Sequence, residues 1–189
     1  MQQAGIAMAS NQGGDTLVEV LVSIAVLGLV IVGAITIMTR GLGASQTALE
    51  HSQVRLLITG QSEMLKKLRD EYAISPTSAA GLVWHSIVTS SNSNVPSYAD
   101  DCSISANKAG TAFYLSQQPS GITSTAYNST NIPSGLPTPG DGFWIEPSKS
   151  TGFTPPYMDF VVRACWLGTG GINQRTVTAM RLYDPDKSH

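Results

Sequence analysis

The chain has 189 residues, and its 11 Lys and Arg against 13 Asp and Glu give a formal net charge of −2. This length allows one compact domain with an appendage and excludes two large domains. No Lys- or Arg-rich run occurs, so the sequence lacks the electrostatic footprint of direct nucleic-acid binding.

The N-terminal part of the chain divides into a polar leader and a long apolar run. Residues 1–14 are small, polar and uncharged, and they end in two glycines. The apolar run begins next, with Glu19 near its start and Arg40 at its end. About 20 uncharged residues separate these two charges, which is roughly the length that a helix needs to cross a bilayer core. We therefore predict a leader over 1–14 and a transmembrane helix over 15–40.

Four glycines interrupt the apolar run and the residues just beyond it: Gly28, Gly33, Gly41 and Gly43. Each glycine weakens a helix by roughly 1 kcal/mol relative to alanine in water. One interpretation is local stretching of the helix or a close contact with another helix. The other is that membrane helices tolerate glycine without a special role. Both interpretations stay open.

An amphipathic pattern follows the apolar run and predicts that the same helix continues. The residues on its apolar side recur at helical spacing: Val54, Leu57, Ile58, Gln61, Leu65, Leu68 and Tyr72. Pro76 predicts the end of the helix near Ile74, because the residue before a proline avoids helical angles. We expect an amphipathic continuation over 41–75 and a helix about 90 Å long in all.

The rest of the chain, 76–189, is predicted to form a β-rich external domain. Gly, Ser, Thr, Asn and Pro dominate as far as Pro139, which predicts strands and long loops, with short apolar runs at 81–84 and 112–115. The clearest strands are 158–166 and 176–183, joined as a hairpin by the glycine-rich loop 168–171. One face of the second strand is expected to lie on the amphipathic helix. The predicted class is α+β, a long helix packed on a small antiparallel sheet.

The chain has two cysteines, Cys102 and Cys165, and both fall within the predicted external domain. In an oxidising compartment they are expected to form one disulfide. The bridge closes a loop of about sixty residues and contributes on the order of 4 kcal/mol to stability. The alternative is two buried free thiols that behave as small apolar side chains.

One short motif carries the main functional prediction. The stretch GDTLVEVLV, from Gly14 to Val22, resembles the class III signal sequence of type IV pilins and type II secretion pseudopilins. In that family a prepilin peptidase cuts after the glycine on the cytoplasmic side and often methylates the new amine. The resemblance implies a cut between Gly14 and Asp15. It also makes Glu19 the fifth residue of the mature chain, where it is expected to pair with the N-terminal amine of a neighbouring subunit.

The resemblance implies a structural, non-enzymatic subunit, a minor pilin or pseudopilin, with no cofactor, metal or catalytic residue. Its partners would be other pilin subunits, the prepilin peptidase, the assembly platform and the cytoplasmic membrane. The precursor is expected to be a single-pass protein of that membrane with its C-terminal domain outside. The mature subunit would lie in an extracellular or periplasmic filament.

The sequence departs from the family pattern at two places, and Glu19 also has an alternative interpretation. The leader contains no Lys or Arg, and Asp15 stands where the family most often has Phe. Thr16 and Glu19 also fit a helix capping box.

The first rival function is an unprocessed, signal-anchored binding or adhesion module on the cell surface. The second is a membrane-tethered enzyme, for which no convergent polar cluster is visible.

Other candidate site residues are isolated. The histidines have no metal-ligand spacing: His51, His85 and His189. Asp184 and Asp186 are possible calcium ligands by residue type, but tail carboxylates are usually only solvated. Asn128 begins a glycosylation sequon by pattern. The tryptophans are interpreted as packing residues rather than as a carbohydrate platform: Trp84, Trp144 and Trp166.

Overall fold

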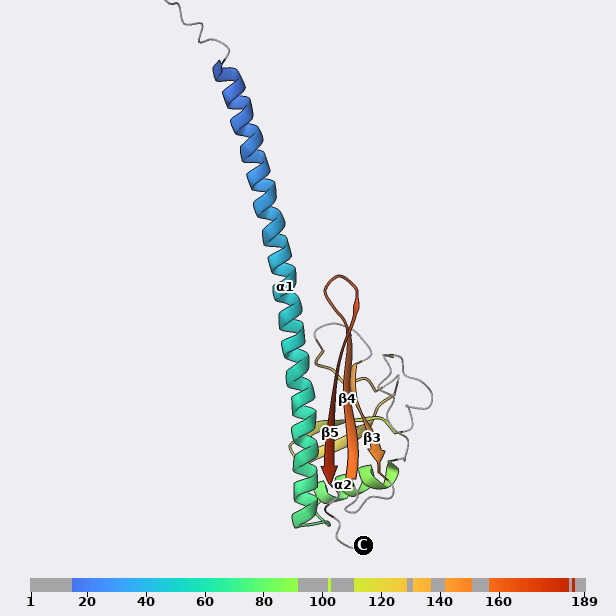
Figure 1. Ribbon diagram of the computed structural model, residues 1–189. Helices are drawn as coiled ribbons and strands as arrows, with labels where there is room; N and C mark the ends of the chain where they lie inside the picture. Colours follow the sequence, from blue (N-terminus) through green and yellow to red (C-terminus); the bar gives the residue numbers. More distant parts are fainter. Residues whose placement is uncertain are drawn as a thin grey trace, which may run out of the picture. The chain divides into compact units, whose positions relative to one another are not determined.

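A computed structural model describes residues 15–91, 102, 111–128, 131–136, 142–150, 157–183 and 185. The chain forms two compact units, one ending at Ser45 and the other beginning at Gln46. Helix α1, Asp15–Ile74, begins in the first unit and ends in the second (Figure 1). The predicted helix and its end before Pro76 are confirmed.

Helix α1 runs without interruption through the four glycines of its first half. A Cβ added at Gly28, Gly33, Gly41 or Gly43 would have no atom within 4 Å. Within the described residues, therefore, no close contact of this chain requires a glycine at these positions.

The second half of α1 buries the side predicted from its amphipathic pattern. Val54, Leu65 and Leu68 are fully buried, and Ile58 and Gln61 are nearly so. These five positions lie on one face because helical residues three, four and seven apart are neighbours. This face of α1 is part of the main apolar core of the second unit.

The prediction of strand and loop around residues 79–90 is wrong, because these residues form helix α2, Ala79–Ser90. Ser78 is the N-cap, and its hydroxyl accepts a hydrogen bond from the Gly81 N–H at 3.0 Å. The buried residues recur at helical spacing: Gly81, Trp84, Ile87 and Val88. The abundant hydroxyls do not break the helix, because Ser90 and Thr89 bond to backbone carbonyls four residues earlier.

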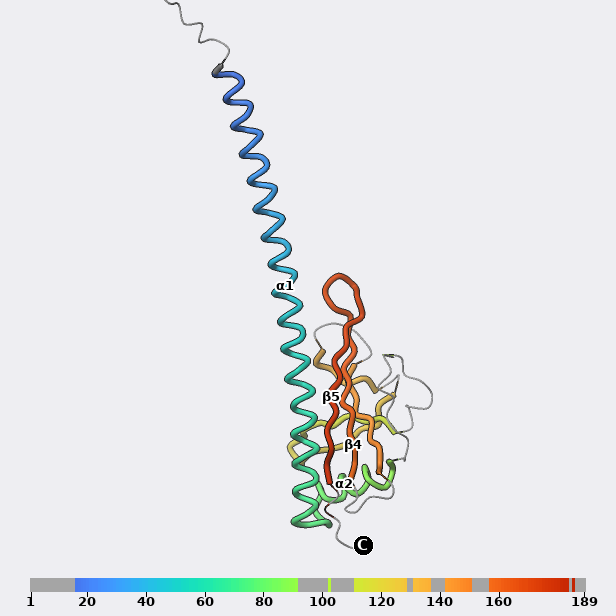
Figure 2. Tube along the Cα trace, in the orientation of Figure 1, coloured from blue at the N-terminus to red at the C-terminus, as the bar shows by residue number. Residues whose placement is uncertain are grey.

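Among its described residues, the second unit contains one antiparallel sheet of five strands in the order β2-β1-β3-β4-β5. The strands are β1 (Phe113–Gln118), β2 (Gly121–Ala126), β3 (Gly142–Lys149), β4 (Tyr157–Leu167) and β5 (Asn173–Tyr183). The predicted hairpin is confirmed as β4 and β5, and both strands are longer than the alternating pattern indicated (Figure 2). Gly170 and Gly171 in its loop have positive φ angles, which suit glycine.

Pro147 lies inside β3, a strand with neighbours on both sides. Ser150 N–H donates to the Tyr157 carbonyl of β4 at 3.0 Å. In an antiparallel pair every second residue faces the partner strand, so Pro147, three positions before Ser150, has its nitrogen facing away from β4. On the other side, β1 meets β3 at a single register position, Phe113 with Ile145. The missing N–H therefore costs no ladder bond, which explains how proline fits this strand.

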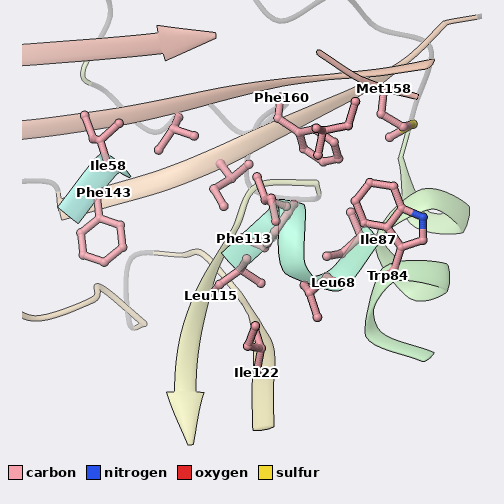
Figure 3. Packing of buried hydrophobic residues seen from close by; sticks show 14 of the residues in the cluster. Ile58, Leu68, Trp84, Ile87, Phe113, Leu115, Ile122, Phe143, Met158 and Phe160 are labelled. Carbon is pink, nitrogen blue, oxygen red and sulfur yellow. The ribbon is translucent and has the colours of Figure 1, made fainter. Parts of the chain in front are cut away.

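The main core lies between the two helices and one face of the sheet. Figure 3 shows Trp84 and Ile87 of α2 close to Met158 and Phe160 of β4. The rings of Trp84 and Phe160 have centroids 5.8 Å apart. Leu182 of β5 is buried in the same cluster, so one face of the last strand packs on the core as predicted.

Candidate functional site

The first unit presents an apolar helical surface that no other described residue covers. From Thr16 to Leu42 every side chain is exposed. The most apolar 18-residue window of α1 has a mean hydropathy of 2.9, and none of it is buried. By length and composition, α1 is therefore able to cross a membrane.

Two threonines inside this apolar run have satisfied hydroxyls. The Thr36 hydroxyl donates to the Val32 carbonyl at 2.8 Å, and that of Thr39 donates to the Thr36 carbonyl at 3.0 Å. A hydroxyl with a backbone partner can enter an apolar environment at low cost. These residues are therefore compatible with burial in lipid or among other helices.

Glu19 lies in the first turns of α1, and its side chain is exposed. Because α1 begins at Asp15, Thr16 lies within the helix and does not occupy the N-cap position that a capping box requires. Gly14, on the other side of the predicted cut, lies outside the described residues. Asp15, which the resemblance places at the start of the mature chain, is the first residue that the structure describes and is part of α1.

The carboxylate of Glu50 on α1 is hydrogen-bonded to the β4–β5 loop. That carboxylate accepts bonds from the Thr169 hydroxyl at 2.5 Å, from the Thr169 N–H at 3.3 Å and from Trp166 Nε1 at 3.3 Å. The Thr169 hydroxyl is the chief cause of a lowered pKa at Glu50. The His51 ring meets the Trp166 ring edge-on at 5.1 Å. Sequence reasoning missed this connection, which links residues 119 positions apart.

The disulfide predicted between Cys102 and Cys165 is present, with Cα atoms 5.8 Å apart. It lies on the sheet face opposite the main core, where Cys165 packs with Tyr127 and Trp144. The rings of these two aromatic residues are stacked, with centroids 5.0 Å apart. The bridge therefore links Cys102 to a second, smaller apolar cluster.

A buried ion pair lies on the same sheet face. Arg163 Nε is 3.2 Å from Glu146 Oε1, and both side chains are more than nine-tenths buried. The Trp144 indole N–H donates to the same carboxylate oxygen at 2.8 Å. The three side chains share a face because β3 and β4 are paired with Trp144 opposite Arg163. No local sequence pattern indicated this pair.

The remaining candidates show no reactive arrangement in the part of the chain that the structure describes. No group of three or more His, Cys, Asp or Glu lies close enough there to hold a metal ion. His51 on α1 contacts the Trp166 ring of β4, and His85 on α2 stacks on the Tyr72 ring of α1. The three tryptophans are buried, which confirms their packing role. His189, Asp184 and Asp186 lie outside the described residues, as do the second and third residues of the Asn128 sequon.

Comparison with known proteins identifies one segment of the chain. Residues 9–35 match the family model of the prokaryotic N-terminal methylation motif, the hallmark of prepilin-type segments in type IV pilins and pseudopilins. No curated protein and no solved structure matches the chain. The motif and the α+β plan together support a pilin-like or pseudopilin-like structural subunit with an apolar helix suited to a membrane.

Proposed function

We propose that this protein is a minor subunit of a type IV pilus or a type II secretion-like filament. It is made as a single-pass membrane precursor, cut between Gly14 and Asp15, and assembled through α1 with other pilin subunits by a membrane platform. The observation that carries the proposal is the methylation motif at 9–35, whose residues 15–35 form the first part of the apolar helix α1. The minor role rests on the large, loop-rich external domain and the unusual leader.

The cut would provide the charge that Glu19 needs. It exposes an α-amine with an ordinary pKa near 8, so the amine is positive at neutral pH. A lone carboxylate in the hydrocarbon region costs about 3 kcal/mol or more, depending on its depth. Pairing Glu19 with the amine of a neighbouring subunit offsets that cost and favours one axial register between the two helices.

The proposed location follows from the helix and the disulfide. The apolar run would hold the precursor in the cytoplasmic membrane, with residues 76–189 outside. A disulfide between Cys102 and Cys165 suits an oxidising compartment, because thiols stay reduced in the cytosol. Assembly would then carry this domain to the periplasm or the cell surface.

The proposal is tested by the N-terminus of the mature protein. Intact mass and N-terminal sequencing should show a chain that begins at Asp15 and carries a methyl group on its amine. Gly14→Ile should block the cut, because a bulky side chain at the last leader position obstructs the protease cleft. Gly5→Ile, a matched change elsewhere in the leader, should leave processing unchanged. Full-length protein in mature material would overturn the proposal.

A second candidate is an unprocessed, signal-anchored adhesion module. It is favoured by the leader's lack of Lys and Arg, which removes the usual signal for retaining that end in the cytoplasm. In that case Gly14→Ile would change nothing, and the protein would begin at Met1 or Gln2. The same sequencing experiment therefore separates the two functions.

A further inference from the structure

Strand β5 forms one edge of the sheet and lacks most of the features that protect such an edge. It lies last in the strand order and pairs with β4 over its 11 residues without a bulge. It also contains no proline and no lysine, which commonly prevent pairing at an exposed edge. The other edge, β2, has 6 residues and contacts α2. Among the described residues, β5 is therefore the edge suited to pairing with another chain.

The ladder determines which backbone groups of β5 point outward. Beside the loop, Gly168 N–H donates to the Ile172 carbonyl at 2.9 Å, so these two residues form a hydrogen-bonded pair. Such pairs alternate along an antiparallel ladder, so the even-numbered residues of β5 bond to β4 and the odd-numbered residues direct N–H and carbonyl away from it. Among the described residues, Val177 and Ala179 make no backbone hydrogen bond outside the ladder.

These outward groups are accessible. Val177 is 40% exposed. Ala179 is exposed too, as are the arginines on either side of the two, Arg175 and Arg181. The four side chains lie on one face, because alternate residues of a strand point to the same side. The outward N–H and carbonyl groups match the backbone of an extended chain, which presents the same groups at every second residue.

The charge of the two last strands indicates which extended segment fits. Together β4 and β5 contain three arginines against one aspartate. That aspartate, Asp159, accepts two hydrogen bonds from Arg181, at 2.7 and 2.9 Å. The edge strand itself has two arginines and no acidic residue. A partner strand with acidic side chains is therefore favoured, because opposite charges across a strand pair are stabilising.

A second copy of β5 fits the edge less well. Antiparallel pairing of two β5 strands over their full length would place Arg175 of each copy opposite Arg181 of the other. Like charges directly opposite each other destabilise a strand pair. The charge pattern thus favours a different, acidic segment over self-pairing.

We propose that the outer edge of β5 binds an extended, acidic segment of a partner protein by strand addition. The outward backbone groups of Val177 and Ala179 lie at the centre of this contact, and the two arginines flank it. The edge is the same in a filament subunit and in an unprocessed adhesion module, so this inference does not rest on the proposed function.

The test uses the full chain in detergent micelles. The probe is a synthetic peptide of about ten residues that alternates glutamate with valine, and its control carries lysine in place of glutamate. Fluorescence anisotropy measures peptide binding, and hydrogen exchange followed by NMR reports the amides of Val177 and Ala179. The acidic peptide should protect both amides from exchange. The lysine peptide should bind about fivefold or more weakly, because it places like charges opposite the arginines.

Proline at an outward position separates backbone pairing from side-chain contact. Ala179→Pro removes an outward N–H and no bond to β4, so it should keep the disulfide and the melting temperature. It should weaken binding of the acidic peptide about fivefold or more, because one intermolecular hydrogen bond is lost. The matched control Ala179→Thr keeps the N–H and should bind as the wild type does. Thr178→Pro removes an N–H that bonds to β4 and should lower the melting temperature.

The outcomes decide the proposal as follows. Protection of Val177 and Ala179 by the acidic peptide, lost in Ala179→Pro and kept in Ala179→Thr, supports strand addition. Unprotected amides in the wild type overturn it, whether or not the proline variant folds. Equal binding of the proline and threonine variants also overturns it. Protection that appears without peptide and rises with protein concentration would identify a second copy as the occupant, and it would overturn the acidic partner.

Discussion

The side chain of Gln61 on α1 pairs with both backbone groups of Leu115 on β1. Its amide nitrogen donates to the Leu115 carbonyl at 2.9 Å, and its amide oxygen accepts from the Leu115 N–H at 2.8 Å. β1 pairs with β3 at Phe113 alone, so the chain needs another partner for Leu115. The Gln61 side chain thus forms the two hydrogen bonds to Leu115 that a neighbouring strand would otherwise form.

Replacing Gln61 should therefore reduce the stability of the fold more than replacing an exposed glutamine. Gln61→Leu leaves the buried N–H and carbonyl of Leu115 without this partner, and we expect a loss of about 2 kcal/mol or more. Thermal and urea unfolding of the full chain in detergent micelles measures the effect. Gln53→Leu, on the exposed side of α1, should change stability by about 0.5 kcal/mol or less. Equal effects of the two changes would contradict this role of Gln61.

Glycine is required at Gly81 for a different reason. A Cβ there would lie 2.6 Å from the carbonyl oxygens of Ser75 and Pro76, and backbone atoms yield little. Gly81→Ala should destabilise the protein by about 1–3 kcal/mol, because this clash outweighs the gain in helix propensity of about 1 kcal/mol. Gly60→Ala, in open space on α1, provides the matched control and should stabilise the isolated subunit slightly. A stabilising Gly81→Ala would show that the two segments are not closely packed.

The carboxylate of Glu50 should make stability depend on pH. The pKa of Glu50 is lowered from 4.5, chiefly by the Thr169 hydroxyl, so the folded chain holds this proton less tightly than the unfolded chain. Its contribution is therefore complete above about pH 4.5 and is lost as the pH falls through the lowered pKa. The melting temperature of the wild type should fall more on acidification than that of Glu50→Gln.

Glu63→Gln is the control for this pH dependence. Glu63 pairs with Lys66 on the exposed side of α1, with 62% of its side chain exposed. Pairs of this kind contribute little to stability, so the variant should follow the wild-type pH profile. If Glu50→Gln also follows it, the connection to Thr169 does not contribute to stability in solution.

The parts of the fold that the sequence predicted are those with a strong local signal. The uncharged run predicted the first half of α1, and the alternating residues around Gly170 predicted the last hairpin. Helix α2 was missed because its four buried positions are few and its hydroxyl-rich composition is typical of loops. Residue spacing carried no signal for Glu146 with Arg163 or for Glu50 with Thr169, because the backbone must fold before these partners meet.

The candidate site shows the same limit. The roles proposed for Gly14 and Glu19 come from one short, contiguous motif, which is visible in the sequence without the fold. The exposure of Leu49 and Leu56 becomes visible only after the structure shows which side of α1 the sheet covers. Before that, leucines at this spacing are equally consistent with a buried core face.

The ion pair of Arg163 and Glu146 provides the last prediction. Arg163→Met removes one charge and leaves a carboxylate that is almost fully buried, which we expect to cost about 3–5 kcal/mol. Adding Glu146→Gln removes the second charge and keeps an oxygen that can accept from the Trp144 indole N–H. The double variant should therefore be more stable than Arg163→Met alone. A double-mutant cycle by urea unfolding measures the coupling, and additive losses would show that the two charges do not stabilise each other.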